Sequence, residues 1–508
     1  MELVNKINTK KKNNYLPLLC FFLGFGLFTF TRRSEIVPTI GITIVLAPIF
    51  ILGFVRTQST KRGICLTIIG FAASLNIALW RLFEVGDPSS SLIFNLVRSS
   101  LLAIPFSLPY VADKLIYPKF KEKGIWSTLT FPTLATAIYF LFSLEGPFDG
   151  DAVFAVFEQG HLIFRQIGSI AGLWGFVFIF SWFASIINCS YEQKAVWAKT
   201  KKHLIVFSSI LLIILLFGAI KTSSLMSPES QTVKIASIVL VPKDGRDIPM
   251  DEIYRNKAPS PFEESMSKIA YLTKKAALND AKIVTFQEYS MTVNEENEDR
   301  LRKQSQRIAK ENDIYFSITY GLFQNEGKGE NKQLLINNQG QIEIDYAKRY
   351  LLGFGEHGET GVFKKGPEII QTADTPYGRI GISICRDMSF PPYIRQAGKK
   401  NVDIMLGPSY DFPKSTCPLY SLRSIENGFS FVRPVYNGVS FAVDYNGRLL
   451  AQMDSDNTED GILYAIVPTK GVQTLYSTIG DLLGWLCVFG FVTFAILSIK
   501  GRARPWKN

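Results

Sequence analysis

Eight long apolar runs constrain the fold of this chain more than any other feature of its sequence. Seven of them precede residue 221, and the eighth lies close to the last residue. Each is near the length of about 20 residues that a helix needs to cross the ~30 Å hydrocarbon core of a bilayer. The sequence therefore predicts a polytopic α-helical membrane domain with eight transmembrane helices, at residues 14–31, 36–55, 63–80, 91–112, 125–144, 169–188, 203–220 and 480–499.

The placement of charge indicates membrane topology and argues against a nucleic-acid-binding face. The net charge is +11, yet residues 221–479 carry 31 Lys/Arg and 32 Asp/Glu, so the positive excess lies in the parts that flank the apolar runs. Basic residues cluster in both tails and in every second loop, at 6–12, 56–62, 114–123, 194–202 and 500–507. Under the positive-inside rule this predicts cytoplasmic termini and an extracytoplasmic segment 221–479.

Residues 221–479 have the alternating pattern of a soluble α/β domain, in which helices cover a sheet. We therefore predict three parts: a seven-helix membrane domain at 1–220, this domain at 221–479, and the eighth helix with a basic tail at 480–508. Its predicted helices are Phe262–Leu278 and Asp299–Ala309, and its predicted strands are Ile235–Val241, Lys282–Glu288, Ile314–Phe323, Arg379–Cys385, Val402–Leu406, Phe429–Val443 and Ile462–Val467.

The sequence offers no pattern that would hold a metal or a cofactor. Its three histidines, His161, His203 and His357, are far apart, and none of its six cysteines forms a C-x-x-C pair. Arg98 lies inside the fourth apolar run, where a charge marks either a functional site or a polar contact within the helix bundle.

Three reactive side chains follow strand-like segments of the α/β domain. Glu288 ends one apolar strand, where burial raises the pKa of a carboxyl group and suits it to act as a general base. Lys348 precedes a turn rich in glycine and aromatic residues, and its ammonium group can stabilise an oxyanion. Cys385 ends another strand before a helical segment, whose positive end should lower the pKa of the thiol. Taken singly, each signal is weak, and a structural role is the more common one for such a residue.

Taken together, Glu288, Lys348 and Cys385 resemble, in order and spacing, the Glu–Lys–Cys triad of the nitrilase (carbon–nitrogen hydrolase) superfamily. Segment 346–356, Y-A-K-R-Y-L-L-G-F-G-E, is similar to the motif Y-x-K-R-H-L-V-P-F-G-E of the bacterial apolipoprotein N-acyltransferases. The segments R-S-I-E-N-G from Arg423 and R-P-V-Y-N-G-V-S from Arg433 resemble the patterns R-A-x-E-x-G and R-x-x-N-x-G-x-S of that family. Eight apolar runs, with the α/β domain between the last two, extend the resemblance over essentially the whole chain.

This resemblance implies an α-β-β-α sandwich and a defined chemistry. Cys385 would be the nucleophile, Glu288 the general base and Lys348 the oxyanion stabiliser, with Glu356 and Asp387 in supporting roles. The implied reaction moves a fatty acyl chain from a membrane phospholipid, through a thioester, to the α-amine of an S-diacylglyceryl-cysteine at a lipoprotein's N-terminus. It implies a multi-pass protein of the bacterial inner membrane that needs no cofactor, metal or nucleic acid.

The sequence departs from the family pattern around the triad. The family's Cys-Tyr-Glu is Cys385-Arg386-Asp387 here, and Tyr289 follows Glu288 where the family has Asn, Thr or Ser. The polar stretch Pro242–Pro261, predicted to be a long loop, lacks the family's usual Trp.

Two other functions remain open at this stage. A membrane-tethered amidase of the same superfamily would act on a small or lipid amide, and a degenerate homologue would only bind lipid or lipoprotein. His357 could also pair with Cys385 in a different kind of thiol site, although the resemblance favours a loop histidine near the site entrance.

Overall fold

The computed structural model describes residues 15–32, 37–80, 88–144, 150–158, 160–193, 196–223, 230–240, 259–353, 355–356, 361–411, 420–454 and 461–500. The chain divides into two compact units. The first contains residues 1–167, 171–217 and 481–508, and the second contains residues 168–170 and 218–480.

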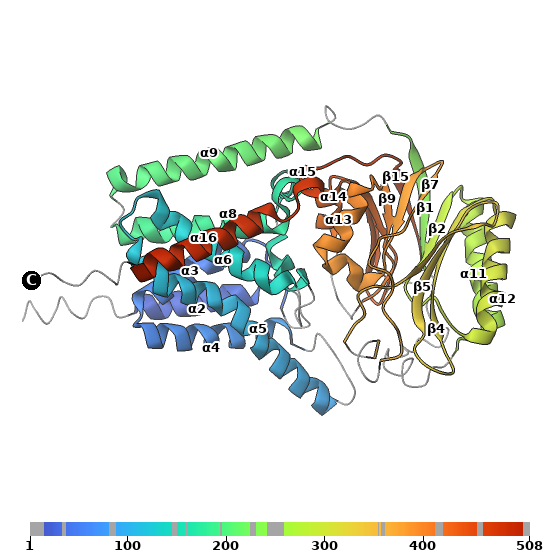
Figure 1. The fold of residues 1–508 in the computed structure, drawn as a ribbon, viewed down its shortest axis with the longest axis horizontal. Helices are drawn as coiled ribbons and strands as arrows, with labels where there is room; N and C mark the ends of the chain where they lie inside the picture. Colours follow the sequence, from blue (N-terminus) through green and yellow to red (C-terminus); the bar gives the residue numbers. More distant parts are fainter. Residues whose placement is uncertain are drawn as a thin grey trace, which may run out of the picture. The chain divides into compact units, whose positions relative to one another are not determined.

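The first unit is a bundle of helices, and each predicted apolar run overlaps one of them (Figure 1). Six of these helices are long and apolar enough to cross a membrane, which gives the chain the character of a membrane protein. The other two, α2 and α3, are apolar but have only 14 and 15 residues. The number of eight spanning helices therefore stays a prediction. The bundle comprises α2 (Leu16–Thr29), α3 (Thr43–Thr57), α4 (Thr60–Ala78), α5 (Pro88–Ile116), α6 (Ile125–Leu144), α8 (Gly168–Glu192), α9 (Trp197–Thr222) and α16 (Leu482–Lys500).

Aromatic rings and small residues pack the inside of the bundle. Phe71 meets both Phe25 and Phe28 edge to face, with ring centroids 5.2 and 5.0 Å apart. At Gly70 the backbone lies directly against the Phe25 ring, so that a β-carbon there would overlap it. The outer surfaces stay apolar, as at Ile213 and Phe489, which are largely exposed. Close packing inside and apolar faces outside are what helices need when lipid is the solvent.

A buried ion cluster ties three helices of the bundle together. The guanidinium of Arg56 on α3 lies 2.8 Å from Asp113 on α5 and 3.4 Å from Glu192 on α8. Its carbon lies 3.4 Å from the centre of the Tyr117 ring. Lys121 also reaches Glu192, at 2.9 Å, but its side chain is half exposed. The cluster lies at the ends of the helices that the charge pattern assigns to the cytoplasm.

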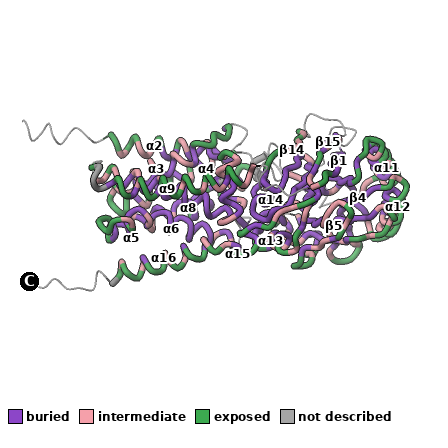
Figure 2. The backbone as a smooth tube through the Cα atoms, turned by 90° about the horizontal axis from the view of Figure 1, so that it is seen from above, coloured by how far each residue is buried: buried purple, intermediate pink, exposed green. Residues whose placement is uncertain are grey.

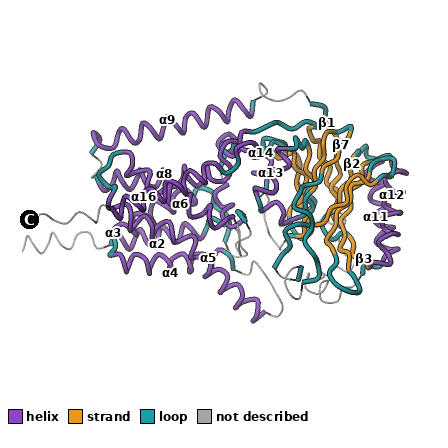
Figure 3. The backbone as a smooth tube through the Cα atoms, viewed as in Figure 1, coloured by secondary structure: helices purple, strands orange, loops and turns teal. Residues whose placement is uncertain are grey.

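The second unit is built on two sheets (Figures 1 and 3). The first has seven strands and the second has six. The first sheet has the order β15-β1-β2-β4-β5-β6, with β3 paired to β4, and the second has the order β14-β13-β11-β9-β8-β7. The first sheet is formed by β15 (Gly461–Pro468), β1 (Thr232–Val239), β2 (Ile283–Phe286), β3 (Met291–Asn294), β4 (Tyr315–Phe323), β5 (Glu330–Ile336) and β6 (Ile342–Ala347). The second is formed by β14 (Leu449–Asp454), β13 (Val439–Val443), β11 (Ser430–Arg433), β9 (Ile404–Leu406), β8 (Gly378–Ile382) and β7 (Thr372–Thr375). A separate pair joins β10 (Ser409–Tyr410) to β12 (Val435–Tyr436).

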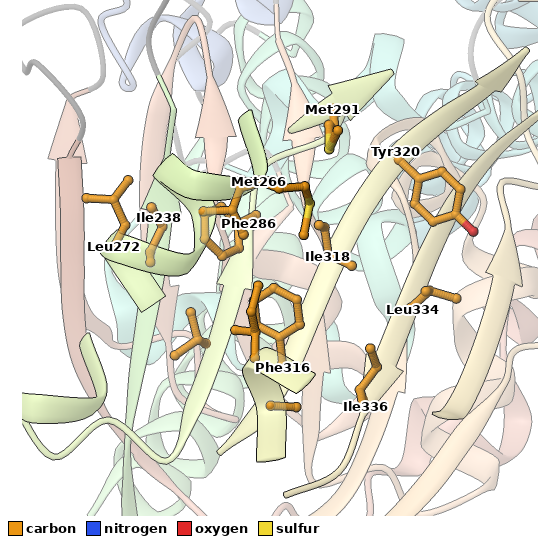
Figure 4. Packing of buried hydrophobic residues seen from close by; sticks show 14 of the residues in the cluster. Ile238, Met266, Leu272, Phe286, Met291, Phe316, Ile318, Tyr320, Leu334 and Ile336 are labelled. Atoms are coloured by element: carbon orange, nitrogen blue, oxygen red, sulfur yellow. The ribbon is translucent and has the colours of Figure 1, made fainter. Parts of the chain in front are cut away.

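The central strands of each sheet, such as β2, β4, β9 and β11, are buried on both faces, and Figure 2 shows buried residues along β4. Because side chains alternate along a strand, Ile235 of β1 belongs to the core between the sheets, whereas Ile238 belongs to the core under the helices. The helices α11 (Phe262–Leu278) and α12 (Glu295–Glu311) contribute to this second core, where Met266 and Leu272 of α11 pack near Phe286 (Figure 4).

The other sheet is covered in the same way. Ile404 and Leu406 of β9 face the first sheet, and Met405 between them packs with Tyr393 and Ile394 of α13 (Pro391–Lys399). The short helix α14 (Ser421–Asn427) lies beside α13. The predicted α-β-β-α sandwich is thereby confirmed.

The structure corrects several predicted elements. The strand predicted at Phe429–Val443 is three strands, β11, β12 and β13, because Pro434 cannot donate to a ladder and Asn437 turns the chain at φ +60°. The helix predicted at Asp299–Ala309 begins earlier, at Glu295, and ends at Glu311. Strands β3, β5, β6, β7 and β14 were not predicted, since their sequences are rich in polar residues.

We expect the substitution Asp113→Ala to destabilise the bundle by about 3–5 kcal/mol, because it leaves the buried Arg56 charge without its closest partner. Unfolding of the full chain in detergent, followed by circular dichroism, measures this. Lys121→Ala is the matched control: it removes a half-exposed ion pair and should cost at most about 1 kcal/mol. Equal losses in the two variants would contradict the role given to the cluster.

Candidate active site

The three predicted reactive residues meet at one edge of the sandwich. Strands β2, β4 and β6 run in the same direction, and so do β8, β9 and β11, so their carboxyl ends share an edge within each sheet. Glu288 follows β2, Lys348 follows β6 and Cys385 follows β8. The chain leaves a sheet at these ends, which frees backbone and side-chain groups for chemistry.

The ammonium group of Lys348 lies between two carboxylates. Its Nζ is 2.8 Å from Oε1 of Glu288, and 3.0 and 2.9 Å from Oε1 and Oε2 of Glu356. All three side chains are fully buried. Two carboxylates around one ammonium leave a net negative charge in a dry environment, which further donors must compensate.

Two residues that the sequence analysis did not place in the site supply such donors. Asn331, at the start of β5, directs Nδ2 at Oε1 of Glu288 (2.8 Å) and at Oε1 of Glu356 (3.0 Å). The hydroxyl of Tyr289 donates to Oε1 of Glu356 and lies 2.8 Å from the same Asn331 nitrogen. For Asn331 the available signal was an amide residue near the start of the segment 330–336, and this signal is weak without the fold.

Cys385 opens a tight turn after β8. Its backbone has φ +48°, a left-handed conformation that a residue with a β-carbon adopts only under constraint, and its N–H donates to the carbonyl of Pro408 at 2.9 Å. The short helix η4 (Cys385–Ser389) follows directly.

One peptide segment connects the thiol to the carboxylate. The Sγ atom of Cys385 lies 3.9 Å from the carbonyl oxygen of Tyr410, and the N–H of Tyr410 donates to Oε2 of Glu288 at 2.8 Å. Because Oε1 already receives Lys348 and Asn331, Oε2 is the oxygen with room for a proton.

The sequence of this region matches the carbon–nitrogen hydrolase family over residues 255–476. This region is a carbon–nitrogen hydrolase domain. Its family is one of enzymes, and the partly buried Cys385 and the buried Glu288 and Lys348 lie within the matched range.

Three curated relatives illustrate what the chain is similar to. An apolipoprotein N-acyltransferase of Geobacter metallireducens is 23% identical over 270 residues, which cover 48% of this chain and 51% of that protein. An apolipoprotein N-acyltransferase of Shewanella oneidensis is 32% identical over 126 residues, 22% of this chain and 24% of that protein. A deaminated glutathione amidase of Dictyostelium discoideum is 31% identical over 137 residues, 24% of this chain and 46% of that protein. The chain thus matches about half the length of these relatives or less.

Among solved structures, an amidase from Nesterenkonia sp. aligns with a TM-score of 0.41 and 18% identity, over 51% of this chain and 98% of that one.

Burial and charge set the protonation of the groups in the carbon–nitrogen hydrolase domain. Burial raises the pKa of Glu288, and the nearby Glu356 charge adds to this, so Glu288 is a stronger base than an exposed glutamate. Burial opposes the charge on Lys348, but the two carboxylates prevail and raise its pKa, so it stays an ammonium ion. Burial likewise opposes the charge on Glu356, yet Lys348 and Tyr289 lower its pKa and keep it ionised.

The prediction that a helix end lowers the pKa of Cys385 was wrong. Burial raises the pKa of this thiol, and the negative charge of Glu288 raises it further. The helix that follows has only five residues, and desolvation outweighs it. The resting group is therefore a thiol, which needs a base to become nucleophilic.

Asp387 connects the turn that begins at Cys385 to the segment that carries Lys348. Its carboxylate accepts a hydrogen bond from Tyr346 at 2.6 Å and from the backbone N–H groups of Ile384 and Tyr350 at 2.9 and 2.8 Å. Burial raises the pKa of Asp387 to about 6, although these donors favour the ionised form. The predicted supporting role of this residue thus has a concrete geometric basis.

The remaining sequence predictions meet different outcomes. Arg98 lies on α5 with a half-buried side chain, and its two interpretations stay open. Arg386 follows Cys385 and donates to the carbonyl of Leu351. His357 and most of the predicted loop Pro242–Pro261 lie outside the described residues. In the described part of the chain, no group of three or more His, Cys, Asp and Glu side chains could hold a metal ion.

We expect the reaction of Cys385 with iodoacetamide to depend on the ionisation of Glu288. Below the pKa of Glu288 the carboxyl group is protonated and cannot take the thiol proton, so the rate should rise as pH rises through that pKa. Glu288→Gln should remove this rise and slow alkylation at neutral pH by about 10²–10⁴-fold.

Mass spectrometry of the Cys385 peptide, over a pH series on the full chain in detergent, measures this rate. Glu263→Gln, at an exposed glutamate of α11, is the control and should behave as the unchanged protein. A pH profile of Glu288→Gln that matches the control would exclude Glu288 as the base.

Proposed function

We propose that the chain is an apolipoprotein N-acyltransferase. It would transfer a fatty acyl chain from a membrane phospholipid to the α-amine of the S-diacylglyceryl-cysteine that begins a diacylated lipoprotein. The observation that carries the proposal is the presence, in one chain, of apolar helices long enough to cross a membrane and of a carbon–nitrogen hydrolase domain in which Cys385 lies beside the buried Glu288 and Lys348. The apolipoprotein N-acyltransferases among its relatives support it.

In the first half-reaction, Oε2 of Glu288 takes the proton from Sγ of Cys385, and the thiolate attacks the ester carbonyl carbon of a phospholipid. The ammonium group of Lys348 is the fixed positive charge available to stabilise the oxyanion that develops on the carbonyl oxygen. The tetrahedral intermediate collapses by breaking the ester C–O bond. Glu288 returns its proton to the departing lysophospholipid oxygen, and the acyl group stays on Cys385 as a thioester.

In the second half-reaction, the lipoprotein α-amine attacks the thioester carbonyl. Glu288 takes a proton from the amine, and the C–S bond breaks. The amide product is released, and the Cys385 thiolate is reprotonated. Amide formation requires that water is kept from the thioester, which is consistent with the burial of Glu288 and Lys348. Glu356 and Asp387 have supporting roles: the first stabilises the charge on Lys348, and the second positions the two catalytic segments.

The orientation of the chain in the membrane is part of the proposal. The clusters of basic residues support cytoplasmic termini and an extracytoplasmic catalytic domain in a bacterial inner membrane. Donor and acceptor are both anchored in lipid, and on that side of the membrane the acceptor amine is accessible.

We expect the purified full chain, incubated with a bacterial phospholipid extract, to add one fatty acyl group to a synthetic S-diacylglyceryl-cysteine peptide. Because the acyl group passes through the Cys385 thiol, Cys385→Ala should abolish the product. Mass spectrometry of the peptide, with and without mild hydroxylamine, measures the gain and distinguishes an amide from an ester.

Two other outcomes are informative. A hydroxylamine-sensitive acyl adduct on Cys385 without acylated peptide would mean that the donor is a phospholipid but the acceptor is not this peptide. Neither adduct nor product would overturn the proposal and favour the amidase alternative, which release of ammonia from lipid amides would then test.

A further inference from the structure

The carboxylates of Glu288 and Glu356 carry more charge than the single ammonium group between them can balance. Lys348 provides one positive charge for two carboxylates, and a proton moving from Cys385 to Glu288 leaves the total charge unchanged. The second negative charge must therefore be stabilised by neutral donors for as long as the site is closed to water.

Only a few neutral donors of the described residues reach these carboxylates. Backbone N–H groups of Tyr410 and Leu352 each serve one outer oxygen, Oε2 of Glu288 and Oε2 of Glu356. The inner oxygens, both named Oε1, are served by Lys348 and by two side chains, Asn331 and Tyr289. Asn331 is the residue that contacts both carboxylates without carrying a charge.

The backbone fixes Asn331 in this place. Its carbonyl accepts the N–H of Lys348 at 2.8 Å, so the strand ladder that ends with Asn331 also positions the catalytic lysine. Its side chain is completely buried on the face of β5 that points between the sheets, two residues from Gln333. Tyr289 is fixed too, by its left-handed backbone at φ +53° and by stacking on Phe363 at 6.2 Å.

We propose that Asn331 and Tyr289 form a neutral bridge that holds the carboxylates of Glu288 and Glu356 together on the Lys348 ammonium. Both are positioning residues: they touch the carboxylates and not the reacting carbon. The inference depends on the proposed function only in treating Glu288 as the base for Cys385. Tyr289, next to Glu288 in the sequence, supplies a phenol to the bridge.

The bridge has a consequence for proton transfer. A donor directed at Oε1 stabilises the ionised form of Glu288, so its removal should make the carboxylate bind a proton at higher pH. The titratable groups that face Glu288 are Lys348, Glu356, Tyr289 and Cys385, and the charges of Asp411 and Arg433 also act on Cys385. None of these groups is changed by substitution of Asn331, which makes this residue the cleaner test.

The experiment is the alkylation of Cys385 by iodoacetamide over a pH series, read from the Cys385 peptide of the full chain in detergent. Asn331→Leu keeps the size of the side chain and removes the amide. We expect it to move the midpoint of the rise in rate to higher pH by about one unit or more, since hydrogen bonds to charged groups have this magnitude. Tyr289→Phe should shift the midpoint in the same direction by less.

Two matched controls come from the same sheet. Gln333→Leu removes a buried amide whose bond goes to Ser317, 2.9 Å away, and Tyr320→Phe removes a hydroxyl bonded to Glu298 at 2.8 Å. Neither contacts the two site carboxylates in the described structure, so both should keep the midpoint of the unchanged protein. Melting temperatures of all variants separate a shifted midpoint from a loss of folding.

An unchanged midpoint in a folded Asn331→Leu variant would overturn the inference, and so would an equal shift in Gln333→Leu. If Asn331→Leu does not fold, Tyr289→Phe decides by the same criterion against Tyr320→Phe. Failure of the proposed base is distinct: there the unchanged protein itself would lack a rise in rate that Glu288→Gln removes.

Discussion

The catalytic part of this structure depends on one ammonium ion enclosed by two carboxylates. Lys348 is buried with Glu288 and Glu356, and none of the three could be tolerated there alone, because a lone charge in a dry interior is far more costly than a paired one. The three form a unit whose spacing is set by bonds of 2.8 to 3.0 Å. Removal of Lys348 would leave two unpaired carboxylates next to Cys385.

This unit also explains why Cys385 rests as a thiol. Burial and the charge of Glu288 both disfavour a thiolate on Cys385, so the proton leaves only when Glu288 can receive it. The two oxygens of Glu288 have different surroundings. Oε1 accepts hydrogen bonds from Lys348 and Asn331, whereas Oε2 lies beside Tyr410, whose carbonyl also contacts the sulfur of Cys385. A resting thiol with a base nearby is compatible with the proposed reaction, in which Cys385 forms a thioester.

The two units of the chain bury apolar residues under different rules. In the sandwich, the alternation along β1 and β9 places one apolar face between the sheets and the other under helices, so every strand side chain at the centre has a partner. In the helical bundle, only the inner faces are packed, and α9 and α16 keep most of their apolar surface exposed. Lipid needs no such covering, which is why membrane-spanning runs are long and uniformly apolar whereas the strands of the sandwich are short.

The sequence by itself determined the apolar helices, the α/β character of residues 221–479 and the identities of Glu288, Lys348 and Cys385 as a set. These follow from local signals: the length of an apolar run, the period of a strand, and a motif within eleven residues, 346–356. It did not determine strands such as β5 and β6, because their polar residues form hydrogen bonds and ion pairs with residues of other elements, as Gln333 does with Ser317. Only the tertiary structure decided that Asn331 and Tyr289 belong to the site and that the pKa of Cys385 is raised. Both depend on contacts between residues that are far apart in the sequence, such as Glu288 and Tyr410, which are 122 positions apart. Both also depend on the exclusion of water that this packing causes.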